Sequence, residues 1–157
     1  MLELLQSADD SDGNIGGVIE ESLEYLNEMT EDSGSLVRQE REAMFRLALE
    51  VSGHSLLVGW TDWQLELLQI ALDLADTAER YQEWEARVSR LIDRQKDGSW
   101  SRDYLEERLA MMRYRLILAR DGANQAAEYR DSYLKMSSFR EMAIRETLEQ
   151  GRYLKAP

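Results

Sequence analysis

The chain contains a single proline, Pro157, and it is the last residue. Because an internal proline ends or kinks a helix, residues 1–156 lack the strongest helix breaker. Leu, Glu, Arg and Ala are abundant, and all four have high helix propensity. No segment shows the alternation and β-branched enrichment typical of strands. The sequence therefore predicts an all-α protein.

Apolar residues recur every three or four positions in segments separated by short polar breaks, most of which contain glycine. This spacing predicts amphipathic helices. We expect about seven of them, over roughly residues 17–29, 36–51, 61–75, 81–92, 102–119, 126–133 and 138–150. The segment that starts at Thr61 is apolar on two sides, which favours the central, most buried helix.

Two helix starts carry the pattern of a capping box, Thr61 with Gln64 and Ser138 with Glu141. In the helix over 102–119, the inward face is expected to comprise Leu105, Leu109, Met112, Leu116 and Ala119. These local signals predict where the elements begin and which side they bury.

A weak internal repeat relates LARDGANQAA (118–127) to TLEQGRYLKA (147–156), at an offset of 29 residues. Each copy has a helix end, a glycine and a later alanine, as in helix pairs that stack in solenoids. We therefore expect one helical-repeat domain over residues 1–157, built as antiparallel helix pairs in a short α-solenoid. The second copy stops within a helix turn, so we expect a fragment of a longer chain.

Charge is divided unevenly along the chain. Residues 101–157 hold eleven Lys and Arg against nine acids, whereas residues 1–100 hold eight against 22, a net charge of -14. An acidic surface repels phosphate, so direct nucleic-acid binding is not expected. The chain has no cysteine, no apolar run long enough for a membrane span and no signal-peptide pattern, and we expect a cytoplasmic location without membrane association.

The stretch DSDGNIGGVIEE (10–21) is similar to a calcium-binding EF-hand loop, with Asp10, Asp12, Asn14 and Glu21 as candidate ligands. The sixth loop position, which needs a positive φ, is Ile15 rather than glycine, and the chain has no second loop of this kind. We therefore favour an acidic helix cap formed by Asp12 or Asn14. No metal ligand is assigned unless the calcium alternative holds.

Catalytic signatures are absent from the sequence. His54, the only histidine, follows a helix stop and has no nucleophile elbow near it, so we interpret it as a loop or cap residue. No phosphate-binding glycine loop is present. We therefore expect no enzyme activity, no catalytic residue and no cofactor.

Tyrosines in the last third lie beside arginines, namely Tyr104, Tyr114, Tyr129 and Tyr133 with Arg108, Arg113, Arg115 and Arg130. Tyr and Arg are enriched in binding hot spots. At helical spacing, however, aromatic residues more often belong to a core. These tyrosines and arginines could therefore form either a binding face or part of the core.

The acidic turn that opens DDSDGNIGGVIEESLEYL (9–26), with helical pairs after it, resembles the tetratricopeptide-like α-helical region that accompanies SWIM-type zinc fingers in bacterial proteins. The resemblance implies the helical scaffold alone, because the Cys and His cluster of the finger is absent here.

The functional prediction is a non-catalytic scaffold that binds a protein or peptide partner, or a second copy of itself. The alternatives are a calcium-responsive module and an accessory domain of a larger nucleic-acid-associated protein.

Overall fold

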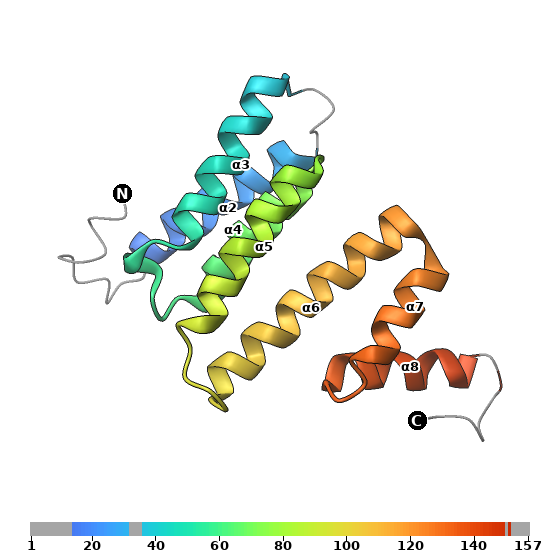
Figure 1. The fold of residues 1–157 in the computed structure, drawn as a ribbon. Coiled ribbons are helices and arrows are strands. Elements are labelled where there is room, and N and C mark those ends of the chain that lie inside the picture. The colour runs from blue at the N-terminus through green and yellow to red at the C-terminus, as the bar shows by residue number, and fades with distance from the viewer. Residues whose placement is uncertain (1–13, 32–35, 150, 152–157) are drawn as a thin grey trace. The chain divides into compact units, whose positions relative to one another are not determined.

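A computed structural model describes residues 14–31, 36–149 and 151. These residues form seven α-helices and one short 3-10 helix, with no strand among them (Figure 1). The helices are α2 (Asn14–Glu31), α3 (Arg38–Ser52), α4 (Thr61–Asp73), α5 (Ala78–Asp93), α6 (Trp100–Asp121), α7 (Ala123–Ser132) and α8 (Ser137–Glu149), and η1 spans Ser55–Leu57. The all-α prediction is confirmed, and the helices pack against neighbours in the chain. In the part of the chain described, no helix is long and apolar enough to cross a membrane.

The chain divides into two compact units, residues 1–97 and 98–157. The first contains α2 to α5 and the second contains α6 to α8. Each unit has its own fully buried aromatic residues, Trp84 and Phe45 in the first and Phe139 in the second. A single domain over residues 1–157 stays a prediction.

Helix α4 is the centre of the first unit, as its two-sided apolar pattern predicts. It packs against α2, α3, α5 and η1. Its buried residues cover more than one side of the helix, namely Trp63, Gln64, Leu65, Leu67, Leu68, Ile70, Ala71 and Leu72, whereas Asp62 and Asp73 are exposed. A helix with apolar residues on more than one side removes them from water only when several neighbours pack on it, and this drives α2, α3 and α5 onto α4.

Two polar contacts fix the partners of α4. The indole of Trp84 in α5 is fully buried and donates to the Leu68 carbonyl oxygen at 2.8 Å. The buried amide of Gln64 donates to the Ser52 carbonyl oxygen at the end of α3, at 3.0 Å. Both contacts satisfy groups that would otherwise be buried without a hydrogen-bond partner.

Arg80, near the start of α5, is buried and joins three elements. Its guanidinium donates to Glu42 of α3 at 2.6 Å, to Asp76 at 2.8 Å and to the Leu74 carbonyl oxygen at 3.1 Å. It also lies over the ring of Phe45, 5.6 Å from the ring centroid. A buried charge is tolerated because it is paired and hydrogen-bonded in this way.

In the second unit, α7 packs against α6 and α8. Phe139 of α8 is fully buried and contacts the rings of Tyr114, Tyr129 and Tyr133. The chain turns from α6 into α7 at Gly122, whose φ of 90° is one that residues with a Cβ rarely adopt. The three helices of this unit therefore pack around a cluster of aromatic rings centred on Phe139.

The buried face expected for α6 is confirmed at Leu105, Leu109 and Met112, but Leu116 is half-buried and Ala119 is exposed. Helix α6 has 22 residues whereas α7 has 10, so α7 cannot cover its whole length.

Neither expected capping box closes within its own helix. Helix α4 is capped at Trp60 without a side-chain hydrogen bond, and Gln64 bonds to Ser52 instead. The Ser138 amide at the start of α8 donates to Glu107 of α6. At α8 the distant residue Glu107 takes the capping role that the local pattern predicts, whereas at α4 the Gln64 side chain bonds to the end of α3 instead of capping.

Candidate protein-binding groove

An apolar groove of about 290 Å³ lies in the first unit, over α4 and between α2 and α3. We call it the α2–α4 groove. Its lining is almost wholly carbon and comprises Ile19, Ser22, Leu23, Leu26, Leu47, Val51, Leu57, Trp63 and Leu67. It forms because α2 and α3 both pack on α4 and leave part of their apolar faces uncovered. The size and chemistry are those of a site for apolar side chains.

Apolar residues extend from the groove to the surface. Leu47 lines it from α3 and is 51% exposed. On α2, Val18 and Tyr25 flank the lining residue Ser22 at i-4 and i+3, and both are exposed. Met29, one turn beyond Leu26, is exposed as well. Contiguous exposed apolar surface of this kind typically marks an interaction site.

Acidic residues gather on the face of α2 that points away from the groove and on the adjoining part of α4. Glu66 of α4 is half-buried and accepts a hydrogen bond from Asn27 of α2 at 2.8 Å. Partial burial raises the pKa of Glu66, and the charges of Glu20 and Glu24 raise it further. Glu24 also lines a small acidic cleft on α2, together with Glu21, Tyr25 and Glu28. The electrostatic potential on this side of the unit is therefore negative.

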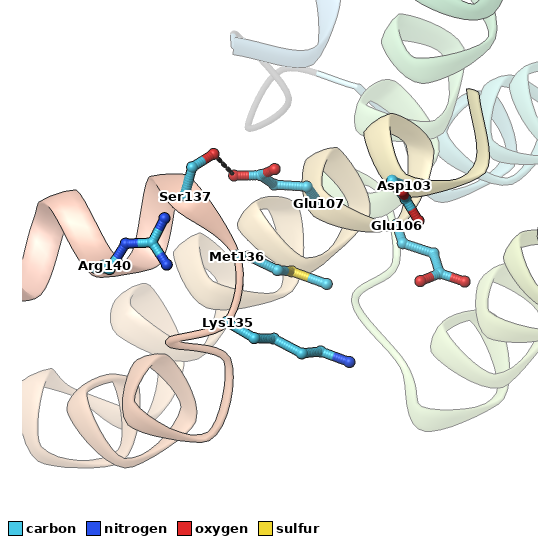
Figure 2. A pocket seen from close by; sticks show the side chains of 7 residues that line it. All are labelled: Asp103, Glu106, Glu107, Lys135, Met136, Ser137 and Arg140. Carbon is cyan, nitrogen blue, oxygen red and sulfur yellow. Dashed lines mark hydrogen bonds between the residues drawn. The ribbon is translucent and has the colours of Figure 1, made fainter. Parts of the chain in front are cut away.

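The second unit contains a polar pocket of about 370 Å³. Figure 2 shows its seven lining residues: Asp103, Glu106, Glu107, Lys135, Met136, Ser137 and Arg140. The carboxylate of Glu107 accepts hydrogen bonds from the Ser137 hydroxyl at 2.9 Å and from the Ser138 amide at 2.7 Å. Hydrogen bonds from Ser138 and Ser137 hold the pKa of Glu107 below its usual value. Glu106 pairs with Arg102 at 2.8 Å.

Two of the three carboxylates in this pocket therefore have structural partners. Glu107 in particular acts as a cap for α8 supplied by α6, since it satisfies an amide in the first turn of α8. The pocket accordingly has a structural explanation that requires no ligand.

Replacing Glu107 with alanine is expected to lower the free energy of unfolding by about 1 kcal/mol, because α8 loses its cap. Glu106→Ala, which removes only the pair with Arg102 four residues earlier in the same helix, should cost about 0.3–0.5 kcal/mol. Urea unfolding followed by helical circular dichroism compares the two variants. Equal losses would contradict the capping role of Glu107.

The candidate calcium ligands are only partly within the described residues. Asp10 and Asp12 lie outside them, Asn14 is the first residue of α2, and Glu21 is exposed on the same helix. Glu21 is seven helical steps from Asn14, which is about 10 Å along the axis. No group of three or more His, Asp or Glu side chains suited to a metal ion occurs in the described ranges. Calcium binding stays a prediction.

His54 caps the 3-10 helix η1, because its Nδ1 atom accepts a hydrogen bond from the Leu56 amide at 3.3 Å. The interpretation of His54 as a cap residue is confirmed. Three of the tyrosines singled out above, Tyr114, Tyr129 and Tyr133, pack around Phe139. Burial, together with the neighbouring Tyr133, raises the pKa of Tyr129. These rings belong to the core of the second unit.

The α2–α4 groove itself is a feature that sequence reasoning missed. Its lining residues have the same periodicity as covered core residues, so the sequence gives no signal for which of them a neighbour leaves open.

The fold defined by these units is all-α, with helices joined by short turns and no strand among the described residues. No protein-family model, no curated protein and no solved structure matches this chain. The resemblance to the helical region that accompanies SWIM-type zinc fingers therefore stays a prediction.

Proposed function

We propose that this chain is a non-catalytic α-helical scaffold that binds a protein or peptide partner in the α2–α4 groove. The observation that carries the proposal is the groove's composition. Its lining is almost wholly apolar and its one hydroxyl, that of Ser22, donates to the Val18 carbonyl oxygen, so the groove offers no acid or base for chemistry but a favourable surface for buried side chains. Burial of apolar area is the main driving force of such association.

The exposed residues around the groove support the same function. Leu47, Tyr25 and Met29 present apolar surface to solvent on two different helices. Each of these side chains is about half exposed or more, so the fold does not depend on burying it fully. A partner that covers the exposed half would remove apolar area from water and so stabilise the complex. Partner binding therefore gives a reason for apolar residues at positions that the core does not cover.

A peptide-display selection against the intact protein tests the proposal. Enriched peptides should bind the wild-type chain and lose at least about tenfold in affinity for Leu47→Asp, which places a charge in the apolar contact. The matched control is Leu118→Asp, at a comparably exposed leucine of α6 in the second unit, and it should leave the affinity unchanged. Peptides that bind Leu47→Asp as tightly as the wild-type chain would contradict the proposal.

A further inference from the structure

We infer that Arg87, Arg90 and Arg94 of α5 form a binding site for a phosphate group. We call these three residues the arginine cluster. The site goes beyond the proposed function, because none of the three residues lines the α2–α4 groove. Two observations on the described residues carry the inference: three neighbouring cations lack a bonded carboxylate, and the half-buried one of them packs on the end of α3 without a hydrogen-bond partner.

Oppositely charged residues face each other along the line where long side chains of α3 meet those of α5. The pairs, in chain order, are Glu42 with Arg80, Arg46 with Glu83, and Glu50 with Arg87. The residue numbers rise together on both helices, so α3 and α5 run in the same direction here. Along this line each positive charge has a negative charge near it.

The alternation of charges stops where α3 stops. Helix α5 continues for more than one turn past Arg87, whereas α3 ends soon after Glu50. Arg90 donates to a carbonyl oxygen of its own helix at 3.1 Å, and Arg94 donates to the Gly53 carbonyl oxygen at 3.3 Å. Within the described ranges, neither arginine forms a salt bridge with a carboxylate.

The members of the arginine cluster leave α5 on the same side. They occupy positions i, i+3 and i+7, which are neighbours on a helix surface. Burial lowers the pKa of Arg87, and the charges of Arg90 and Arg94 lower it further. The charge of Glu50 raises the pKa of Arg87. Three cations therefore repel one another with one carboxylate near them, and a bound anion would relieve this repulsion.

Arg87 is placed by its contact with Gly53. A Cβ added at Gly53 would collide with the Arg87 guanidinium, so this group packs directly on the backbone at the end of α3. The Nε atom of Arg87 is buried, and the side chain has no hydrogen bond or salt bridge to any described residue. A partly buried charge with unused donors is stabilised by an acceptor that a ligand supplies.

The charge of the arginine cluster favours phosphate over carboxylate as the ligand. A guanidinium presents a planar set of N–H donors that matches the oxygens of either group. Three positive charges less the one negative charge of Glu50 leave +2 at the cluster. A phosphate monoester carries about -1.5 to -2 at pH 7 and three acceptor oxygens, whereas a carboxylate carries one charge and two oxygens. Phosphate is therefore the better match.

Nucleic acid is the less favourable source of this phosphate. Its backbone would bring further phosphates over the rest of the first unit, within a segment that carries a net charge of -14 over residues 1–100. One isolated phosphate group, on a small molecule or on a modified side chain of a protein, needs to contact only the arginine cluster. The inference is therefore limited to isolated phosphate groups.

Titration of inorganic phosphate into the intact protein tests the site. The readout is NMR of the arginine Nε–H groups, and sodium chloride at matched ionic strength is the control. The Arg87 signal should shift saturably in phosphate, with a dissociation constant on the order of 1 mM. A shift in phosphate that does not exceed the shift in chloride would overturn the proposal.

Matched variants separate the arginine cluster from general attraction to positive charge. Arg90→Gln/Arg94→Gln removes the two exposed members and leaves the packing of Arg87 on Gly53 intact. It should weaken phosphate binding at least about tenfold, because two charged donors are lost.

The control is Arg108→Gln/Arg115→Gln, which removes two exposed arginines of α6 with the same change in net charge. It should weaken phosphate binding by less than about twofold. Equal weakening by the two double variants would show a response to net charge alone and would overturn the site.

Two further ligands identify the source of the phosphate. Peptides with a central phosphoserine and randomised flanks are selected against the intact protein, beside the same peptides with serine. Phosphoserine peptides that bind at least about tenfold tighter than inorganic phosphate, and that Arg90→Gln/Arg94→Gln releases, would support a site for a phosphorylated protein. Saturable binding of inorganic phosphate without such peptides would support a site for a small phosphate compound.

A short single-stranded oligonucleotide is the remaining arm. Binding at least about tenfold tighter than that of inorganic phosphate, lost in Arg90→Gln/Arg94→Gln, would assign the arginine cluster to nucleic acid and overturn the inference.

Discussion

Replacing Trp84 with alanine is expected to lower the free energy of unfolding by about 4 kcal/mol, the largest loss expected at any single position. The side chain is fully buried in the first unit, and its indole nitrogen donates to the Leu68 carbonyl oxygen. The substitution leaves a cavity at the junction of α4 and α5 and removes that hydrogen bond. Such a loss is a large part of the roughly 5–15 kcal/mol typical of a domain. Urea unfolding followed by helical circular dichroism measures it.

Two further variants separate packing from general sensitivity to the loss of tryptophan. Trp84→Phe keeps most of the ring but removes the indole hydrogen bond to the Leu68 carbonyl oxygen, so a loss of about 1–2 kcal/mol is expected. Trp100→Ala removes an indole that is 77% exposed and should change stability by no more than about 0.5 kcal/mol. A loss for Trp84→Ala no greater than that for Trp100→Ala would show that α5 does not pack on α4 as described.

Replacing Arg80 with alanine is the second large effect, with an expected loss of about 2–3 kcal/mol. Arg80 is the buried member of a set that includes Glu42, Asp76 and the Leu74 carbonyl oxygen. Its removal takes the guanidinium donor from the Leu74 carbonyl oxygen, leaves Glu42 and Asp76 only their contacts with Arg46 and Arg41, and uncovers the ring of Phe45. The loss is below that for a fully buried pair because the side chains of Glu42 and Asp76 are 37% and 46% exposed. Arg46→Ala removes a well-exposed partner of the same Glu42, and its cost should be only a small fraction of the Arg80→Ala loss.

The contribution of Arg80 should also depend on pH. Hydrogen bonds from Arg46 and Arg80 lower the pKa of Glu42 from its usual 4.5. A carboxyl whose pKa is lower in the folded state stabilises the fold above its unfolded-state pKa, and this contribution is lost as the pH falls through the folded-state pKa. The difference in unfolding free energy between the wild-type chain and Arg80→Ala should therefore shrink below pH 4.5. A difference that stays constant into acid would show that the Arg80–Glu42 pair does not carry the effect.

The positions of the helices could be predicted from the sequence because the information is local. The two-sided apolar pattern after Thr61 identifies α4 as the central helix, and its buried residues confirm this. Gly122 marks the turn between α6 and α7, where a positive φ is required. Periodicity and turn residues depend on neighbours in the sequence, so reading along the chain is sufficient for them.

Contacts between distant residues could not be predicted in this way. Gln64 fits a local capping box, yet it donates to Ser52, and Glu107 caps a helix that begins 30 residues later. Arg80 has the sequence of a surface position, but Asp76 and Glu42 allow it to be buried. The groove could not be predicted for the same reason, because the exposure of Leu47 depends on how α2 and α3 pack on α4.

The tryptophan pair beside the groove gives this chain a built-in optical sensor. Trp60 is half exposed and stacks on Trp63, with ring centroids 4.3 Å apart and planes within 6° of parallel. Trp63 in turn lines the groove. Two indoles this close couple their electronic transitions, so light absorbed by one is shared with the other. Any segment that presses on Trp63 would disturb that coupling and change the near-ultraviolet circular dichroism without an added label.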